Sequence, residues 1–576
     1  MSPVPGNSVG RVRAAYTAIH AASRPEIWIT LRPADDALAE AAAIDARIAA
    51  GEPLPLAGLL TAVKDNIDVA GMPTTAGAPS FAYQPTADAT AVARLRAAGV
   101  VVVGKTNLDQ FATGLVGTRS PHGAVRNAWD PTRISGGSSS GSGVAVALGL
   151  VDLAIGTDTA GSGRVPAALN GVVGVKPTRG VIPCTGVVPA CRTLDCVTVF
   201  ARSLDLARRA VAVMGGPDGI DPQATLLGDY PRGAWRLPDG GCAPADRAPR
   251  LAIPLPTQLD GLADGWAEAF AAAVDRLREA GVEAVSVDIT PLLEAAALLY
   301  GGSFVAERYT AVGAHIAANI AAIGDGLDPV VAQIILEGAD FTAAELFADA
   351  ERLDGFAAQA AAALVGFDAL LTPTTTAHPT LAEVAADPIG VNSRLGRYTN
   401  FANLLDLASL AVPAGTVRGL PFGIMLTGPA GSDARLAEIA ARYDQAAVDL
   451  LVVGAHLSGQ PLNHELIAAG GTLTGPVATA PHYRLFALDT TPPKPGLVRV
   501  TTDAAAGGAS IAGEVWRLPA TGFGRFTAGL AAPMAIGRVY LDDGRNVLGF
   551  LCEPAAVAGA ADITSYGDWR AWRERL

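Results

Sequence analysis

The sequence has few cysteines, few charged residues and no long apolar run. Its five cysteines are an odd number without the paired spacing of metal sites, so we expect reduced thiols in a cytoplasmic protein. No run reaches the roughly 18 apolar residues of a membrane-spanning helix, and the opening residues lack the apolar centre of a signal peptide. Only 17% of the residues are charged and the formal net charge is −13, which argues against a nucleic-acid partner.

Familiar chemical motifs are also absent. The glycine-rich stretch 135–180 has no GxxxxGK[ST] sequence, so it does not form a P-loop for phosphates. It meets the GxSxG pattern of nucleophilic serines only loosely, at 137–141, and no histidine with an obvious partner acid follows. The late histidines His456, His464 and His482 show no HxxxH spacing and no companion cysteine pair. We therefore expect no metal and no cofactor.

Two clusters of small residues stand out instead, at 136–143 and 156–164, separated by the apolar run 144–155. Glycine lets backbone N–H groups approach a ligand closely, and serine adds a hydroxyl, so two such turns can bring two serines to one point. A flexible Gly/Ser linker is the alternative interpretation. The apolar run has the length of one buried helix, and Asp158 and Arg164 flank the second cluster, which both argue against a linker.

This arrangement resembles the signature of the amidase-signature hydrolases, which have a GGSS-type turn, here 136–139, and a GTD-x-x-GS turn, here 156–162. The resemblance implies a Ser–Ser–Lys triad. Ser162 would be the nucleophile, Ser138 the bridging serine, and Lys64 of a V-K-D-N segment the base.

The resemblance also implies an oxyanion hole, made by backbone N–H groups of the second turn: Thr159, Ala160, Gly161 and Ser162. Three small departures from the family pattern occur. Ser140 and Gly143 stand where Gly and Ala are common, and Ala160 stands where Gly is common. None of them touches the triad.

Lys64 ends the apolar segment 59–63, which we expect to be a buried strand. A lysine there could equally reach the surface and remain charged. A serine hydroxyl is a weak nucleophile and needs a base, and a lysine can be that base only when neutral. Its pKa would have to fall far below ~10.4, which burial in a low-dielectric interior can achieve.

Alternating helical and strand patterns, such as 87–98 followed by 99–104, predict an α/β fold with a mixed central sheet covered by helices. Up to about 445 we expect the amidase-signature fold. From 450 to 576 short strands between Gly and Pro turns predict a small strand-rich α+β domain. We expect 203–248 to be a long surface loop.

This second domain resembles the C-terminal domain of allophanate hydrolases, whose fold is like that of gamma-glutamyl cyclotransferases. The likeness is carried by 453–463 and 480–488, and the segments 187–196 and 299–309 also look like that subgroup. The resemblance implies hydrolysis of allophanate (urea-1-carboxylate) to ammonia and N-carboxycarbamate.

The substrate carries a carboxylate, and Arg308 suits it because a guanidinium can hold a carboxylate through two parallel hydrogen bonds. Tyr300 could add a hydroxyl donor. The Gly-rich loop 111–121, with Gly114 and Leu115, is implied to form one wall of the pocket. The alternative for Arg308 is an ion pair with a surface acid.

The second domain is implied to help decarboxylate N-carboxycarbamate with a histidine, for which His464 and His482 are our candidates. We further expect a homodimer, and a biotin-dependent urea carboxylase or a biuret-producing enzyme as the neighbouring activity. Two other functions stay open. One is an amidase for aryl, aliphatic or peptide amides, which would share the triad without needing Arg308. The other is a non-catalytic amide-binding protein or a component of a transamidase.

Overall fold

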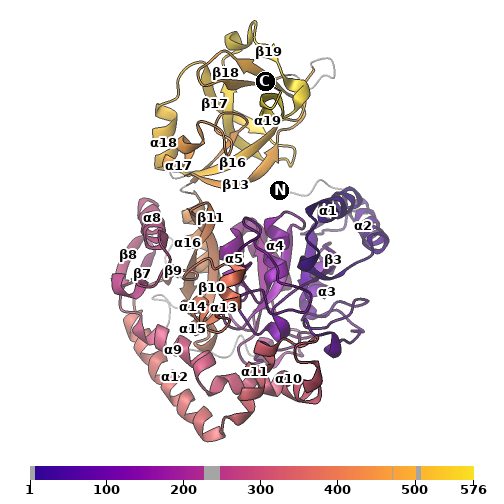
Figure 1. Cartoon of the computed structure of the whole chain (residues 1–576), viewed down its shortest axis with the longest axis vertical. Helices are drawn as coiled ribbons and strands as arrows, with labels where there is room; N and C mark the ends of the chain where they lie inside the picture. The colour runs from indigo at the N-terminus through magenta and orange to yellow at the C-terminus, as the bar shows by residue number, and fades with distance from the viewer. Residues whose placement is uncertain (1–6, 226–246, 446, 470, 501–506, 576) are drawn as a thin grey trace. The chain divides into compact units, whose positions relative to one another are not determined.

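The computed structural model describes residues 7–225, 247–445, 447–469, 471–500 and 507–575 (Figure 1). By its internal contacts the chain divides into two compact units, with the division at Arg442. We call them the first unit and the second unit and describe each by itself. Among the described residues, no helix has both the length and the apolar character needed to cross a bilayer.

The first unit is built on an eleven-stranded mixed sheet in the order β1-β3-β2-β4-β6-β5-β10-β11-β9-β7-β8. Its strands are β1 (Trp28–Leu31), β2 (Leu60–Lys64), β3 (Val101–Thr106), β4 (Leu153–Asp158), β5 (Val173–Lys176), β6 (Cys196–Ala201), β7 (Arg250–Pro254), β8 (Glu283–Val287), β9 (Ala369–Pro373), β10 (Ala408–Val417) and β11 (Leu420–Gly428). β2 pairs in parallel with β3 on one side and with β4 on the other. The carboxyl ends of these three strands therefore lie at one edge of the sheet, where α/β proteins place their ligand sites.

Helices surround this sheet (Figure 1). They are α1 (Ser8–Ala22), α2 (Ala34–Ala49), α3 (Thr90–Ala97), α4 (Ser140–Ala147), α5 (Val165–Asn170), α6 (Leu204–Met214), α7 (Pro222–Thr225), α8 (Trp266–Glu279), α9 (Thr290–Gly301), α10 (Ala306–Ala318), α11 (Pro329–Glu337), α12 (Ala343–Ala363), α13 (Leu381–Ala386), α14 (Gly390–Leu395), α15 (Asn400–Leu404) and α16 (Asp433–Gln445). The predicted α/β fold with a mixed, helix-covered sheet is confirmed.

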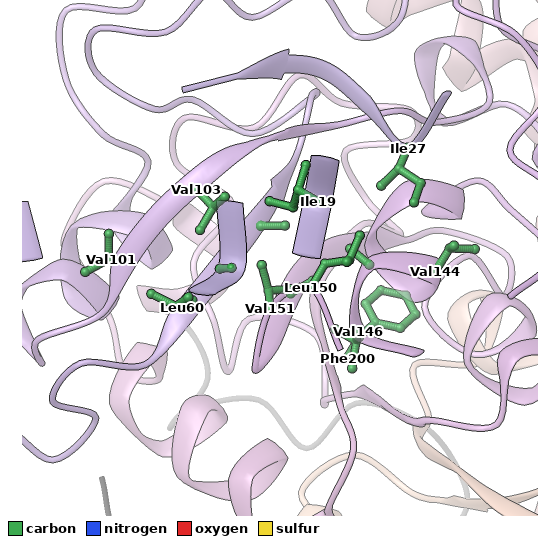
Figure 2. Packing of buried hydrophobic residues seen from close by; sticks show 14 of the residues in the cluster. Ile19, Ile27, Leu60, Val101, Val103, Val144, Val146, Leu150, Val151 and Phe200 are labelled. Atoms are coloured by element: carbon green, nitrogen blue, oxygen red, sulfur yellow. The ribbon is translucent and has the colours of Figure 1, made fainter. Parts of the chain in front are cut away.

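The core of the first unit explains why its strands read as continuous apolar runs. Figure 2 shows Leu60 of β2 and Val103 of β3 in one buried cluster with Val144 and Val146 of α4. Parallel strands that are covered on both faces have no polar side to alternate with. The ends of these strands are therefore held rigidly by apolar packing.

The prediction of a single helix over 144–155 is wrong. α4 begins inside the Gly/Ser cluster, at Ser140, and ends at Ala147, and β4 starts at Leu153. Gly149 has a φ of 71°, and the N–H groups of Gly149 and Leu150 donate back to carbonyls of the last helical turn. This left-handed glycine ends the helix and turns the chain into the strand.

The predicted surface loop over 203–248 is also wrong at its beginning. Leu204–Met214 forms helix α6, and the Ser203 side chain caps it by accepting a hydrogen bond from the Leu206 N–H. Leu204, Ala207, Ala210 and Met214 are buried along one face, so the helix packs through an apolar stripe. Residues 226–246 of the expected loop lie outside the described residues.

The second unit contains a five-stranded sheet in the order β13-β16-β12-β18-β17 and a three-stranded sheet in the order β15-β14-β19. Its elements are β12 (Ala447–Val452), α17 (Asn463–Ala468), β13 (Thr472–Ala478), β14 (Tyr483–Leu488), β15 (Lys494–Arg499), β16 (Ala512–Pro519), α18 (Ala520–Ala528), β17 (Met534–Tyr540), β18 (Asn546–Cys552), β19 (Ala561–Asp562) and α19 (Trp569–Arg573). Leu450, Leu451, Trp516 and Trp569 belong to its own buried core. The predicted strand-rich character is confirmed.

Candidate active site

The lysine and the bridging serine meet at the carboxyl edge of the sheet. Lys64 is the last residue of β2, and Ser138 lies in the turn before α4. The Lys64 Nζ donates to the Ser138 Oγ at 2.8 Å and to the Thr157 Oγ1 at 2.8 Å. All three side chains are buried. The structure therefore brings together Lys64 and Ser138, which are far apart in the sequence.

Lys64 is a buried amine without a carboxylate in contact. Among the described residues it hydrogen-bonds only to hydroxyl groups and the Thr157 carbonyl. Burial lowers its pKa from the ordinary 10.5 to about 7, although the more distant charges of Asp109, Asp195 and Asp158 oppose this shift. A large fraction of Lys64 is therefore neutral near pH 7 and can accept a proton.

The turn that carries Ser162 is fixed from within by Asp158. One carboxylate oxygen of Asp158 accepts from the Gly161 N–H and the other from the Gly163 N–H, each at 2.9 Å. The Arg164 guanidinium binds the same two oxygens at 2.8 and 2.9 Å, and both side chains are fully buried. Burial is the largest influence on the pKa of Asp158 and raises it, but the Arg164 charge and hydrogen bonds, the Lys176 charge and the Gly163 N–H together outweigh burial, so the pKa is lowered and the carboxylate stays ionised.

Glycine is required inside this turn. Gly161 has a φ of 139°, and a Cβ there would lie 2.4 Å from the Thr399 hydroxyl oxygen. Any other residue would be strained and would collide with Thr399. The conformation of the turn that carries Ser162, which we call the nucleophile turn, is thus set by Gly161 and by Asp158.

The backbone N–H groups of the turn are not equivalent. The Gly161 N–H is engaged by Asp158, so it is not free to bind a ligand. The N–H groups of Thr159, Ala160 and Ser162 donate to no other group in the described part of the chain. The Ser162 hydroxyl likewise makes no hydrogen bond with described residues, including Ser138, and its residue is 1% exposed.

Asp109 holds the loop that was expected to form a pocket wall. Its carboxylate accepts from the N–H groups of Val116, Gly117 and Arg119 at 3.0 to 3.1 Å. The Leu115 carbonyl accepts from the Gly137 N–H at 2.8 Å. This bond ties the loop directly to the turn before Ser138.

Gly114 and Leu115 lie in this loop, and Leu115 is bonded to a residue that lines a cavity. The Leu115 N–H donates to the Asn392 Oδ1 at 2.7 Å, and Gly114 has a φ of 157°. Asn392 and Tyr300 line a cavity of about 430 Å³. The other lining residues are Arg119, Val305, Ile334, Glu337, Asp340, Phe341, Glu345, Ile389 and Ser393.

Arg308 of α10 is buried against Tyr300 of α9. Its Nη2 donates to the Tyr300 hydroxyl at 3.0 Å, its Nη1 donates to the Thr113 Oγ1 at 3.1 Å, and its Nε has no partner. The residue is 1% exposed and forms no ion pair with any acid in the described part of the chain. The alternative of a surface ion pair for Arg308 is therefore wrong. A buried guanidinium without a charged partner is able to bind an anion.

The second unit has its own small cavity, and neither of the two candidate histidines lines it. His464 is exposed and bonds to the Pro461 carbonyl, while His482 is half-buried and stacks on Tyr483. The cavity is lined instead by His456, with Lys494 and with Val452, Val453, Gly454, Ala455, Pro495, Leu530, Met534 and Phe550.

His456 was not singled out from the sequence. It is 8% exposed, its ring stacks on Phe550 at 4.9 Å, and its Nε2 lies 3.0 Å from the Glu465 Oε2. Burial lowers the pKa of His456, although Glu465 opposes the shift, so the imidazole is neutral at pH 7. The signal was available, because His456 lies within the segment 453–463 that carries the resemblance of this domain.

Comparison with known proteins gives two family matches. The family described as Amidase matches residues 12–437, and the family described as Allophanate hydrolase C-terminal domain matches residues 448–574. The chain belongs to the amidase family. It is an amidase-family hydrolase that carries an allophanate-hydrolase C-terminal domain, as its motifs predicted.

Relatives of known identity cover different parts of the chain. The structure of the allophanate hydrolase of Kluyveromyces lactis is 40% identical with a TM-score of 0.69, over 99% of this chain and 97% of that one. The urea amidolyase of Lachancea kluyveri is 42% identical over 91% of this chain, but the chain spans only 30% of that relative's length. One subunit of the glutamyl-tRNA(Gln) amidotransferase of Symbiobacterium thermophilum is 36% identical over 72% of this chain and 88% of its own length.

Proposed function

We propose that this chain hydrolyses allophanate to ammonia and N-carboxycarbamate through Lys64, Ser138 and Ser162. The observation that carries the proposal is the 2.8 Å hydrogen bond between the Lys64 Nζ and the Ser138 Oγ, in a site where burial lowers the pKa of Lys64 to about 7. The similarity to an allophanate hydrolase over nearly the whole chain supports the choice of substrate.

The proposed reaction begins with two proton transfers. Neutral Lys64 takes the proton of Ser138, and Ser138 takes that of Ser162, whose oxygen attacks the carbonyl carbon of the terminal amide. The proton returns along the same route to the amide nitrogen, the C–N bond breaks and ammonia leaves. Water then attacks the acyl-enzyme by the reverse sequence and releases N-carboxycarbamate.

The negative oxygen of the tetrahedral intermediate needs preorganised donors. The N–H groups of Thr159, Ala160 and Ser162 have no other acceptor in the described chain and supply them, while Gly161 serves the turn through Asp158. Loss of one oxyanion donor typically costs about 10²–10³ in rate. Gly161 is thus proposed to act by its conformation rather than by its N–H.

The proposed specificity comes from Arg308 and Tyr300. Binding of the substrate carboxylate would give the buried guanidinium a charge-assisted partner. The Tyr300 hydroxyl already accepts from Arg308, so its own proton is available to the same carboxylate. Gly114 and Leu115 would shape the wall beside them.

The second unit is proposed to assist the next step, in which N-carboxycarbamate loses CO₂. In that step a C–N bond breaks, its electron pair stays on nitrogen, and the nitrogen gains a proton. His456 suits proton transfer better than His464 or His482 because it is buried and lines a cavity together with Lys494. The Lys494 ammonium would bind a carboxylate of the substrate.

The division of labour follows the domain boundaries, which we propose at 1–445 and 450–576. A chain that ends at residue 445, before β12, is expected to release ammonia from allophanate while N-carboxycarbamate persists longer. Adding residues 446–576 should shorten the lifetime of that intermediate, and His456→Ala in the added domain should weaken the effect. An unchanged lifetime with and without the domain would contradict this role.

Ammonia release by the purified chain, offered allophanate beside acetamide and benzamide, tests the proposed substrate. Allophanate should be the preferred substrate, and Ser162→Ala should abolish turnover. Preference for the neutral amides would support an amidase of other specificity, and a requirement for a partner protein would support the transamidase alternative. A biotin-dependent urea carboxylase is the proposed source of allophanate, with a biuret-producing enzyme as the alternative, and we expect a cytoplasmic homodimer.

A further inference from the structure

Asp195 is a buried carboxylate beside the nucleophile turn, and the proposed reaction does not use it. It lies directly before β6, is 4% exposed, and forms no ion pair in the described part of the chain. Its Oδ1 accepts from the Thr159 Oγ1 at 2.5 Å, and its Oδ2 accepts from the Ala190 N–H at 2.9 Å. The Cys191 N–H is a further donor at 3.3 Å.

The buried carboxylate of Asp195 is therefore bound by neutral donors alone, without a salt bridge. Burial raises the pKa of Asp195 to about 6, so at pH 7 and above the group is ionised and acts only as an acceptor. The Thr159 hydroxyl must then be the donor in the short bond. Its proton is directed toward Asp195, which fixes the side-chain rotamer of the first residue of the turn.

The two ends of the turn are held by different carboxylates. Asp158 accepts from the N–H groups of Gly161 and Gly163 in the later part of the turn. Asp195 accepts from the side chain of Thr159, the first residue of the turn. Asn403 joins the two sides, because its Nδ2 donates to the Asp158 carbonyl at 2.9 Å and to the Leu194 carbonyl at 3.2 Å. The antiparallel pairing of Asp158 with Cys196 also links the end of β4 to the start of β6, directly after Asp195.

We propose that Asp195 is a positioning residue for the oxyanion hole: through the Thr159 hydroxyl it sets the direction of the free N–H groups of Thr159 and Ala160. The inference rests on the proposed function and adds a residue to it. Oxyanion donors act only when they point at the position of the developing charge, so a small rotation at Thr159 lowers their effect.

The sharpest test changes the hydroxyl and leaves the backbone donor in place. Thr159→Val keeps the shape of the side chain and removes the bond to Asp195, and Thr159→Ser keeps the hydroxyl. Thr159→Val is expected to lower kcat by up to the roughly 10²–10³-fold that loss of one oxyanion donor costs, with KM little changed. Thr159→Ser should stay within a few fold of the wild-type chain.

Two further measurements separate positioning from a general structural role. The Ki of a boronic acid that forms a tetrahedral adduct with Ser162 should rise in parallel with the loss of kcat/KM in Thr159→Val. Thr372→Val is the matched control, because Thr372 of β9 is buried and its hydroxyl has no partner in the described chain. It should leave kcat, KM and Ki unchanged.

Asp195→Ala completes a double-mutant cycle. If Asp195 acts through Thr159, the effects of Asp195→Ala and Thr159→Val on kcat will not add, because either change removes the hydrogen bond between the two side chains. Wild-type kcat in Thr159→Val, equal losses in Thr159→Ser, or additive effects in the cycle would overturn the inference. Turnover that survives Ser162→Ala would overturn the proposed function itself, which distinguishes the two failures.

Discussion

Two lysines lie near the carboxyl ends of neighbouring strands of the same sheet, and they have opposite surroundings. Lys64 is the last residue of β2, and Lys105, one residue before the end of β3, pairs with Val63. Both side chains are completely buried. Lys105 lies 3.1 Å from the Asp65 Oδ1 and also donates to the Thr74 hydroxyl, whereas Lys64 has hydroxyl and carbonyl partners and no carboxylate in contact.

The comparison shows that burial alone does not make a lysine a base. Burial lowers the pKa of Lys105 as well, but the charge and hydrogen bond of the Asp65 carboxylate oppose that shift, and Lys105 forms one half of a buried ion pair that joins two strands. Lys64 has no carboxylate in contact, so burial disfavours its protonated form and lowers its pKa. Neutral Lys64 can then accept a proton. The difference is the position of one carboxylate, that of Asp65.

The largest expected effect comes from Lys64→Met. Methionine fills a similar volume without an amine, so kcat should fall by at least roughly 10⁴-fold, as expected when one member of a unit of cooperating catalytic residues is lost. The melting temperature should not fall, because no ion pair is broken and the cost of burying an ammonium group is removed. Ammonia release and calorimetry on the same preparations would check both statements. A large loss of stability would contradict the assignment of Lys64 as the catalytic lysine.

Lys105→Met should act in the opposite sense. It leaves the Asp65 carboxylate buried without its cation, which typically costs about 3–5 kcal/mol in unfolding free energy. The double variant Lys105→Met/Asp65→Asn should recover much of that loss, since no unpaired charge remains and Asn can still accept from the Thr75 N–H. Chemical denaturation measures the free energies. Equal stability of the single and the double variant would show that the pair is not the cause.

Arg308→Met extends the comparison to a third buried cation. Truncating one partner of a buried charge pair costs about 2–5 kcal/mol, so KM for allophanate should rise by roughly 30-fold or more. Neutral amides should be hydrolysed almost as before, because they offer no carboxylate. Steady-state kinetics on both substrate classes decide the question, and equal losses on both would make Arg308 a structural residue.

The last prediction concerns the pH dependence of activity and stability. If Lys64 acts as the proposed base, kcat/KM should fall tenfold per pH unit below its pKa of about 7. In the unfolded chain the pKa returns to about 10.5, so between pH 7 and 10.5 the unfolded state binds more protons and stability rises with pH. Lys64→Met should remove this rise, and Lys105→Met/Asp65→Asn should retain it. Unfolding measured across that pH range would test the sign.

Short sequence motifs predicted which residues belong to the site. They did not predict hydrogen-bond partners that depend on the backbone conformation of a turn. Lys64, Ser138 and the family were predicted from short motifs. The engagement of the Gly161 N–H by Asp158 could not be predicted, because it depends on a φ of 139° that the sequence does not specify. Lys105 gave no signal, since its partner Asp65 is adjacent to Lys64 in sequence and reaches Lys105 only across the sheet.

The histidines and the helix assignments show the same limit. His464 and His482 were chosen as candidates instead of His456. The spacing of residues in the sequence does not show which histidine lines a cavity, because that depends on the fold. The apolar run 144–155 is continuous in sequence, and only the left-handed Gly149 separates its helix from its strand. Apolar patterns predicted that these residues are buried, but not the secondary structure in which they are buried.

The most direct test of the central claim is the rate at which a fluorophosphonate labels Ser162. Such a reagent phosphonylates only a serine whose proton is removed by a nearby base, with loss of fluoride. We expect labelling at Ser162 in the wild-type chain and in Lys105→Met/Asp65→Asn, and labelling slower by roughly 10²–10⁴-fold in Lys64→Met, the range of general-base catalysis. Labelling of another serine, or an unchanged rate in Lys64→Met, would contradict the assignment of Lys64 and Ser162.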